Sequence, residues 1–379
     1  MTMQKVKIAV VGCGMISDAY LTTMMEKFKI LEVAGCCDIN EERARTQAQK
    51  YGIRALTMNQ ILADKSIEIV VNLTTPIAHY PVIKQLLLAG KNVYTEKVLA
   101  VELDHAAELA SIATNNGLYL GAAPDTFLGA AAQTARSIVE SGLIGQVTSC
   151  TASLSRDGAI FGQPGNFTTQ PGGGIGFDVG IYYITALLSI LGPITSVSGI
   201  TKTLVPHRIA STFDHWGTPF EIRCENLMAA TMQFAQGTVG TALFDANSIF
   251  ILPEQPSVIL FGTLGAVYLA DPNSFGGDVK VILKGNNQPM VMQQSHAFNG
   301  ECRGLGVAEM AWSLRMNRPH RASKEMAFHA LDVLHGIVKS SQTGFAQSIS
   351  SSFAIPAPLP KGYHGQGAFE FIEEIALAL

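Results

Sequence analysis

Residues 8–17 have the sequence Ile-Ala-Val-Val-Gly-Cys-Gly-Met-Ile-Ser, which joins an apolar run to a Gly-x-Gly-x-x-Ser turn. Gly12 permits a tight turn, Gly14 lets the backbone approach a pyrophosphate, and Ser17 is small enough for the contact between helix and strand. A helix that begins near Met15 would direct its N-terminal amides and the positive end of its dipole at the phosphates. This order of strand, turn and helix predicts a dinucleotide site.

An acidic residue supports the same prediction. Asp38 ends the next apolar run, Leu31–Cys37, where a carboxylate can accept hydrogen bonds from a ribose 2′-hydroxyl. Its negative charge lies where the 2′-phosphate of NADP would bind, and neither Ile39 nor Asn40 supplies a compensating cation. Arg43, one turn into the next helix, could reach back only partially. We therefore predict NAD as the cofactor.

Length and composition indicate an enzyme of two domains. The chain has 379 residues, of which 47% are apolar and 15% are charged, and this length exceeds what one hydrophobic core usually serves. The net charge of −4 comes without a basic stripe, which argues against nucleic acid as a partner. The apolar run at residues 6–11 is too short for a signal sequence or a membrane span, so we expect a cytoplasmic protein.

The possible metal ligands and disulfides have unsuitable spacing. No C-x-x-C motif occurs among the six cysteines, which we interpret as reduced packing residues: Cys13, Cys36, Cys37, Cys150, Cys224 and Cys302. His329, Asp332 and His335 would lie on one helix, but the two histidines would diverge by about 120°. No further cluster joins them, so we predict no metal site.

The first third of the chain alternates strands and helices. Strands are expected at residues 6–11, 31–37, 67–73, 92–95 and 119–123, and helices at 41–51, 58–63, 79–89 and 103–115. Such alternation predicts an α/β fold with a doubly wound parallel sheet. We assign residues 1–124 to an NAD-binding Rossmann domain.

The pattern changes after Pro124. Strands are expected at residues 147–155, 196–204, 222–226, 228–235, 238–246, 258–261, 266–269 and 279–283. Helices are expected at 127–141, 304–316 and 324–341, followed by a Pro/Gly-rich tail at 355–367 and a short terminal helix. We assign residues 125–379 to an α+β domain with a large, mostly antiparallel open sheet that binds substrate.

Two segments carry further candidate chemistry. Residues 94–97, Tyr-Thr-Glu-Lys, end a strand whose carboxyl edge faces the nicotinamide crevice, and Lys97 is better placed there for function than for solubility. The glycine-rich run 172–180 leads into an apolar helix, and its glycines would let the backbone run close to a ligand. Asp178 and Tyr182, four residues apart, would share one face of that helix.

With these motifs the chain resembles the Gfo/Idh/MocA oxidoreductases, which include glucose-fructose oxidoreductase and inositol dehydrogenases. The resemblance covers nearly the whole sequence and rests on Gly12-Cys13-Gly14, Asp38, Thr75-Pro76 with His79, Glu96-Lys97, Asp178-x-Gly180-x-Tyr182, residues 262–265 and residues 271–273. It implies that NAD is bound by Gly12, Gly14, Met15, Ile16, Asp38, Thr74, Thr75, Pro76, His79, Glu96 and Lys97. It also implies that Lys97 and Asp178 are catalytic, that substrate lies between the domains, and that the second sheet serves a homo-oligomer, a dimer or tetramer.

The sequence departs from the family pattern at two positions. The Glu-Lys dipeptide is usually followed by a proline, often with a cis bond, whereas Val98 follows Lys97 here. Because a non-proline cis bond costs about 3 kcal/mol, we expect a trans bond or packing to place Lys97. The second departure is Tyr182, which stands where inositol-dehydrogenase-like members have histidine and which matches the glucose-fructose oxidoreductase branch.

These groups can support hydride transfer. A secondary alcohol gives up hydride to nicotinamide only as its proton leaves, so a base must reach the hydroxyl. Lys97 would stabilise the developing alkoxide, Tyr182 would act as acid and base if the cation lowers its pKa, and Asp178 would orient either group or hold a neighbouring hydroxyl. Other interpretations remain open: a surface charge for Lys97, a helix cap for Asp178, core packing for Tyr182, and Tyr183 as the active phenol.

Weaker substrate candidates are Asp125, which either caps the next helix or reaches a sugar hydroxyl, and Arg156, Asn166 and Asp245. We predict an NAD-dependent dehydrogenase that acts on a secondary hydroxyl of a sugar, a glycoside (C3 included) or a cyclitol, as an inositol dehydrogenase does. One alternative is an NAD-dependent enzyme that cleaves glycosides through a transient 3-keto sugar. Another is a non-catalytic sensor of NAD or sugar, against which the intact Lys97, Asp178 and Tyr182 argue.

Overall fold

The structure is a computed structural model that describes residues 4–158, 165–248 and 258–360. The chain forms two compact units. The first contains the described residues up to Ala130, Ser295–Ala327 and the described residues from Pro356 on, and the second contains Ala131–Gln294 and Phe328–Ile355. Our division at residue 124 stays a prediction, and the expected terminal helix lies outside the described residues.

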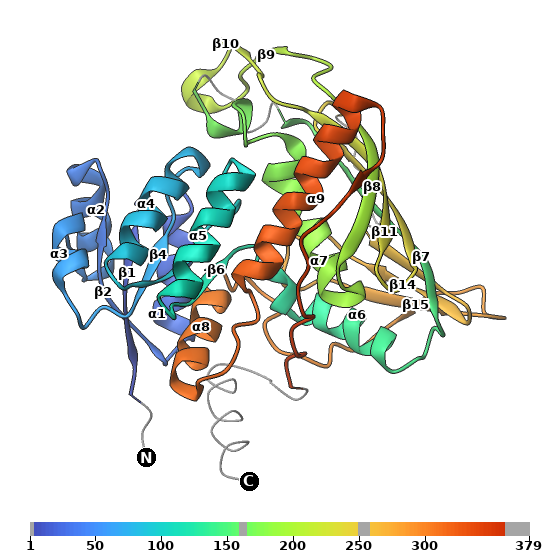
Figure 1. The fold of residues 1–379 in the computed structure, drawn as a ribbon, viewed down its shortest axis with the longest axis horizontal. Coiled ribbons are helices and arrows are strands. Elements are labelled where there is room, and N and C mark those ends of the chain that lie inside the picture. The colour runs from blue at the N-terminus through green and yellow to red at the C-terminus, as the bar shows by residue number, and fades with distance from the viewer. Residues whose placement is uncertain (1–3, 159–164, 249–257, 361–379) are drawn as a thin grey trace. The chain divides into compact units, whose positions relative to one another are not determined.

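The first unit is built on a parallel sheet of six strands in the order β3-β2-β1-β4-β5-β6 (Figure 1). Its strands are β1 (Val6–Val11), β2 (Leu31–Cys37), β3 (Arg54–Ala55), β4 (Ile69–Asn72), β5 (Asn92–Thr95) and β6 (Leu120–Ala122). The strand order reverses between β1 and β4, and ligands of such sheets bind beyond the carboxyl ends of the strands at this point. The predicted doubly wound parallel sheet is confirmed.

Helices connect these strands: α1 (Ser17–Lys27), α2 (Glu41–Tyr51), α3 (Met58–Ala63), α4 (Pro76–Leu88) and α5 (Leu103–Asn115). Helix α8 (Leu305–Met316), later in the chain, belongs to the same unit. Local sequence explains their starts: the Asn40 side chain accepts the amides of Glu42 and Arg43 at α2, and Thr57 forms a capping box with Gln60 at α3. Helix α4 begins at Pro76, since proline favours the first helical position.

The second unit contains a sheet of nine strands in the order β16-β15-β14-β13-β7-β12-β11-β8-β17. Its strands are β7 (Val147–Ser155), β8 (Ile194–Lys202), β11 (Leu227–Phe234), β12 (Val239–Asp245), β13 (Val258–Gly262), β14 (Gly265–Leu269), β15 (Val279–Leu283), β16 (Met290–Val291) and β17 (Gln347–Ser348). All neighbouring pairs are antiparallel except β12 and β7. The predicted mostly antiparallel sheet is confirmed.

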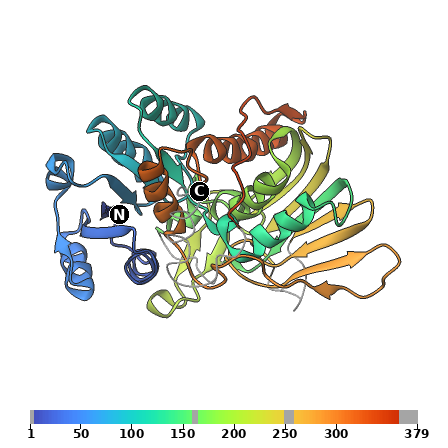
Figure 2. The ribbon, with the colours of Figure 1, turned by 90° about the horizontal axis from the view of Figure 1, so that it is seen from below.

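Helices α6 (Ala130–Glu140), α7 (Ile181–Leu191) and α9 (Lys324–Thr343) lie on one face of this sheet (Figure 2). Strand β12 shows the resulting alternation: Gly240, Ala242 and Phe244 are buried beneath the helices, whereas Val239 and Leu243 are exposed on the other face. The core of the unit therefore lies between the sheet and these helices.

Three sequence-based predictions of secondary structure are wrong. Residues 222–226 form a loop, because their amides bond to separate partners, including Ile222 N to Pro206 O at 2.8 Å, and β10 (Pro219–Glu221) precedes them, paired with β9 (His207–Ile209). The helix expected at 127–141 is interrupted where Gly129 is extended, between η1 (Thr126–Leu128) and α6. The helix expected around Asp178 starts as a π-helical turn, η4 (Gly176–Gly180).

Candidate functional site

The first unit presents an open glycine turn beyond β1. Gly12 has φ +101°, and a Cβ atom there would lie 2.6 Å from the carbonyl carbon of Leu73. A Cβ atom on Gly14 would meet no atom within 4 Å, so this stretch of backbone is open to a ligand. Ser17 is fully buried, and its hydroxyl donates to Gly14 O at 2.6 Å. A small residue is needed at that position, as the sequence predicts.

Asp38 is held beside this turn. Its Oδ2 accepts the backbone N–H of Cys13 at 2.7 Å, and its Oδ1 accepts that of Asn40 at 2.8 Å. The carboxylate is therefore fixed at the end of β2 and retains further lone pairs for other donors. Ile39, the next residue, is fully exposed.

The residues at the end of β4 lie at the same edge of the sheet. The buried Asn72 donates from Nδ2 to Thr95 Oγ1 at 2.9 Å, and its Oδ1 accepts the Thr74 hydroxyl at 2.8 Å. Thr75 is the N-cap of α4 but makes no side-chain hydrogen bond to the helix, and Ile77 in its first turn is exposed. The first turn of α4 thus presents an apolar side chain at the end of β4.

Lys97 follows β5 at this edge, and a buried carboxylate accepts a hydrogen bond from its backbone. Glu96 Oε2 accepts the backbone N–H of Lys97 at 3.1 Å, and Glu96 Oε1 accepts the Tyr20 hydroxyl at 2.7 Å. The Lys97–Val98 peptide bond is cis, so the expectation of a trans bond is wrong. Val98 is buried, and its carbonyl oxygen contacts Nδ1 of His79 at 2.6 Å, so packing and a side chain both hold this segment.

Asp125 caps a distant helix. Its Oδ2 accepts the amides of Gly304 at 3.2 Å and Gly306 at 2.9 Å, where α8 begins, whereas the next helix receives no hydrogen bond from it. The expected cap on the next helix is therefore wrong. The side chain is only 2% exposed, and burial raises its pKa to about 6. We do not propose it as a contact for a sugar.

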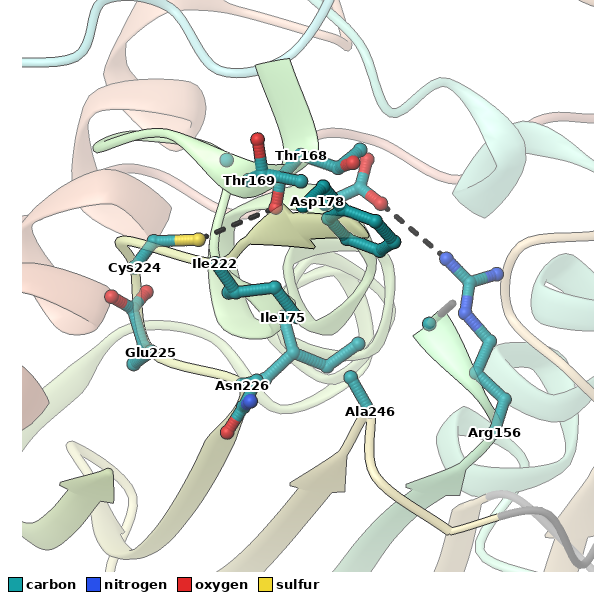
Figure 3. Close-up of a pocket in the computed structure, with 13 residues that line it drawn as sticks. Arg156, Thr168, Thr169, Ile175, Asp178, Ile222, Cys224, Glu225, Asn226 and Ala246 are labelled. Atoms are coloured by element: carbon teal, nitrogen blue, oxygen red, sulfur yellow. Dashed lines mark hydrogen bonds and ion pairs between the residues drawn. The ribbon is translucent and has the colours of Figure 1, made fainter. Parts of the chain in front are cut away.

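Asp178 and Arg156 meet in the second unit. Arg156 Nη2 donates to Asp178 Oδ2 at 3.4 Å across a small pocket (Figure 3). The cavity has a volume of about 40 Å³ and is lined also by Thr168, Thr169, Ile175, Phe220, Ile222, Glu225 and Asn226. Asp178 lies in the π-helical turn η4, so the α-helical period that was used to place it on the face of Tyr182 does not apply there.

The glycine run places backbone against protein side chains. A Cβ atom on Gly174 would overlap the carboxyl group of Glu225, and one on Gly180 would contact the ring of Phe244. Burial raises the pKa of Glu225, and its Oε1 has no hydrogen-bond partner among the described residues. Sequence reasoning missed Glu225, since it lies far along the chain from the glycines, within the misassigned strand.

Two consecutive tyrosines lie near the start of α7. Tyr182 and Tyr183 are both buried. The Tyr183 hydroxyl donates to Asp271 Oδ1 at 3.0 Å, and its ring centroid lies 5.5 Å from that of Phe244. The phenol of Tyr183 is thus engaged within the second unit.

The remaining substrate candidates take part in local turns. Asn166 Oδ1 accepts the amide of Thr168 at 3.2 Å at the start of η3 (Phe167–Thr169). Asp245 ends β12, and although burial raises its pKa, hydrogen bonds from Ser248 and Asn247 hold that pKa below its ordinary value.

Both ring nitrogens of His329 contact groups of the protein. Its Nε2 accepts the backbone N–H of Ile194 at 2.9 Å, and its Nδ1 lies 2.8 Å from Ser351 Oγ. Within residues 4–158, 165–248 and 258–360, no three His, Cys, Asp or Glu side chains gather to hold a metal ion. Over the same ranges, no helix has the length and apolar character needed to cross a membrane.

Comparisons with known proteins agree on one family. Residues 6–123 match the model "Oxidoreductase family, NAD-binding Rossmann fold", and residues 132–268 match the "GFO/IDH/MocA C-terminal domain". A D-xylose dehydrogenase of Paenarthrobacter nicotinovorans is 26% identical over 177 residues, which are 45% of this chain and 46% of that protein. The chain therefore spans about half the length of this relative.

Two further proteins are similar. A D-glucoside 3-dehydrogenase of Escherichia coli (strain K12) is 26% identical over 248 residues, which cover 63% of this chain and 70% of that protein. The solved structure of levoglucosan dehydrogenase in complex with NADH and L-sorbose has a TM-score of 0.79 at 16% identity and covers 92% of this chain and 100% of its own. The structural match establishes a shared fold.

Proposed function

Because this chain belongs to the GFO/IDH/MocA oxidoreductase family, we propose that it is an NAD-dependent dehydrogenase acting on a secondary hydroxyl of a sugar, a glycoside or a cyclitol. Lys97 carries the proposal. It lies at the carboxyl end of β5, at the same edge of the parallel sheet as the Gly12–Gly14 turn and Asp38, and the buried Glu96 fixes its backbone. A cation held at this edge is suited to a developing alkoxide.

The residues of the first unit fit a dinucleotide. The open backbone at Gly14 suits a pyrophosphate, the fixed carboxylate of Asp38 suits a ribose diol, and the exposed Ile39 and Ile77 offer apolar contacts to a base. When bound, the nicotinamide supplies the acceptor for hydride. We propose NAD over NADP because Asp38 would repel a 2′-phosphate.

Lys97 and Tyr182 would divide the proton chemistry. We assign to the Lys97 ammonium the stabilisation of negative charge on the substrate oxygen as its proton leaves. We assign to the Tyr182 phenol the role of acid and base. Tyr183 is the weaker candidate, since its hydroxyl already donates to Asp271.

Asp178 and Arg156 would bind the sugar hydroxyls. A carboxylate accepts hydrogen bonds and a guanidinium donates them, so the pair can hold two adjacent hydroxyls. Phe220 and Ile222 line the same pocket and can contact the apolar C–H face of a sugar ring. This mixture of charged and apolar groups supports a carbohydrate as substrate.

The open face of the second sheet would bind a second copy of the chain. Among its residues, Ile200 of β8, Val239 and Leu243 of β12, and Phe261 of β13 are exposed apolar side chains. An apolar sheet face of this kind usually marks an interface. We propose a homo-oligomer, and sedimentation equilibrium would test it: a monomer at micromolar concentration would contradict it.

The test of the proposed function is a substrate panel. Aldoses, alkyl and aryl glycosides and inositols are incubated with enzyme and NAD, while NADH absorbance and released aglycone are both measured. Reduction of NAD by at least one of these polyols is expected. Aglycone release without net NADH would favour glycoside cleavage through a keto sugar, and NAD binding with no turnover on any compound would favour a sensor.

A further inference from the structure

His79 connects two segments of the site, yet its ring is withdrawn from solvent. It lies on α4, with an exposed fraction of 0%. Its Nδ1 is 2.6 Å from Val98 O, and its Nε2 is 2.9 Å from Thr74 O. The resemblance implies a cofactor contact for His79, but a ring buried in this way contacts protein on both sides.

The two carbonyl groups belong to segments with different tasks. Thr74 follows β4, beside the Gly12 turn, where Gly12 approaches Leu73 and Thr74 closely. Val98 directly follows Lys97. The imidazole therefore spans from the dinucleotide side of the sheet edge to the lysine segment.

A carbonyl oxygen only accepts hydrogen bonds, so a neutral ring donates to one of the two carbonyl groups and only the imidazolium donates to both at once. Burial lowers the pKa of His79, while the two carbonyl contacts and Glu96 oppose this shift. Lys97, the other charged group near the ring, favours its neutral form. A residue without a donor at this position would leave buried carbonyl groups unpaired, which is costly.

We propose that His79 is a positioning residue that holds the Lys97 segment through Val98 O and the dinucleotide loop through Thr74 O. The proposal deepens the proposed function and rests on it. It assigns one task to each ring nitrogen: Nδ1 places Lys97 for turnover, and Nε2 shapes the loop that binds the cofactor.

Two amide substitutions separate these tasks. The amide nitrogen of asparagine lies near the place of histidine Nδ1, and that of glutamine near the place of Nε2. His79→Asn therefore keeps the donor to Val98 O, whereas His79→Gln keeps the donor to Thr74 O. His105→Asn is the matched control, because this histidine of α5 stacks on Tyr80 and contacts neither carbonyl group.

The affinity for NADH is measured by fluorescence without substrate, and kcat with the best polyol of the panel. His79→Asn is expected to weaken NADH binding about fivefold while kcat stays within about twofold. His79→Gln is expected to lower kcat by roughly tenfold or more while NADH binding stays within about twofold. His105→Asn should change neither quantity.

Equal losses of both quantities in both variants, or no loss in either, would overturn the proposal. Thermal unfolding of each variant shows whether the fold survives. If the wild-type protein turns over no polyol, the proposed function has failed, and Lys97 is then followed by NMR after ¹³C-methylation of lysines, with Lys97→Arg for assignment. The titration curve of the Lys97 resonance should differ from that of the wild-type protein in His79→Gln and should match it in His79→Asn. The reverse pattern would contradict the assignment.

Discussion

Tyr20 of α1 donates a hydrogen bond of 2.7 Å to Oε1 of Glu96, whose other oxygen accepts the backbone N–H of Lys97. Both side chains are buried. Helix α1, which begins at the dinucleotide turn, is thereby connected to the segment that carries the lysine. One carboxylate holds two parts of the proposed site that lie far apart in sequence.

Tyr20→Phe should disturb this connection. Loss of the hydroxyl leaves a buried carboxylate oxygen without its donor, so the free energy of unfolding should fall by about 1–3 kcal/mol. We expect kcat to fall by about fivefold while NADH affinity is retained, as measured by steady-state kinetics and fluorescence titration. Tyr51→Phe is the control, because the Tyr51 hydroxyl bonds to Asp18 at 2.9 Å and not to Glu96. An unchanged kcat in Tyr20→Phe would show that the hydrogen bond from Tyr20 to Glu96 does not place Lys97.

Cofactor choice should depend on Asp38. Its carboxylate is fixed by the amides of Cys13 and Asn40, so it cannot easily turn away from a 2′-phosphate. Calorimetric titration should show tighter binding of NAD than of NADP, and Asp38→Ala should narrow the difference. Tighter binding of NADP by the wild-type protein would refute the prediction.

The two tyrosines of α7 should behave differently. Tyr182→Phe should remove the phenol that we assign as acid and base, lower kcat by roughly 10²-fold and flatten the high-pH limb of its pH profile. Tyr183→Phe loses the hydrogen bond to Asp271 and should reduce stability by about 1 kcal/mol with little effect on kcat. A larger loss of activity in Tyr183→Phe would reverse the assignment.

Asp125 should make stability depend on pH. Its pKa in the folded protein is about 6, above the ordinary value near 3.8, so its contribution is greatest below pH 3.8 and is lost as pH rises through 6. The shift corresponds to about 3 kcal/mol. Asp125→Asn keeps an acceptor for the amides of α8 and lacks this titration. The free energy of unfolding of Asp125→Asn should therefore rise relative to that of the wild-type protein as the pH increases from 4 to 7.

Urea denaturation at several pH values measures this difference. Asp64 serves as the control, because hydrogen bonds from Ser66 lower its pKa and Asp64→Asn should show no such gain over the same range. A difference for Asp125→Asn that stays constant or shrinks from pH 4 to 7 would contradict the buried, titrating carboxyl group.

The sequence predicts the parts of the site that depend on local pattern. The Gly12–Gly14 turn and Asp38 follow from glycine geometry and strand periodicity, and both appear at the carboxyl edge of the first sheet. The predicted limits of α2, α3 and α5 agree with the structure, since caps and apolar spacing define them locally.

Other features depend on contacts between distant segments. Tyr20 and Glu96, or Asp125 and the start of α8, meet only after folding, and no local pattern marks either pair. The glycines on either side of Asp178 likewise depend on distant residues: a Cβ atom on Gly176 would overlap Met228, and one on Gly180 would overlap Phe244.

Hydride transfer can be observed directly with a sugar that carries deuterium at the carbon to be oxidised. A polyol identified in the panel is prepared in this form and incubated with NAD, and the mass of the reduced cofactor is measured. The account predicts reduced cofactor heavier by one mass unit with the wild-type enzyme, and a rate lower by roughly 10²-fold or more with Lys97→Met at unchanged NAD affinity. Reduced cofactor without deuterium, or normal turnover by Lys97→Met, would contradict it.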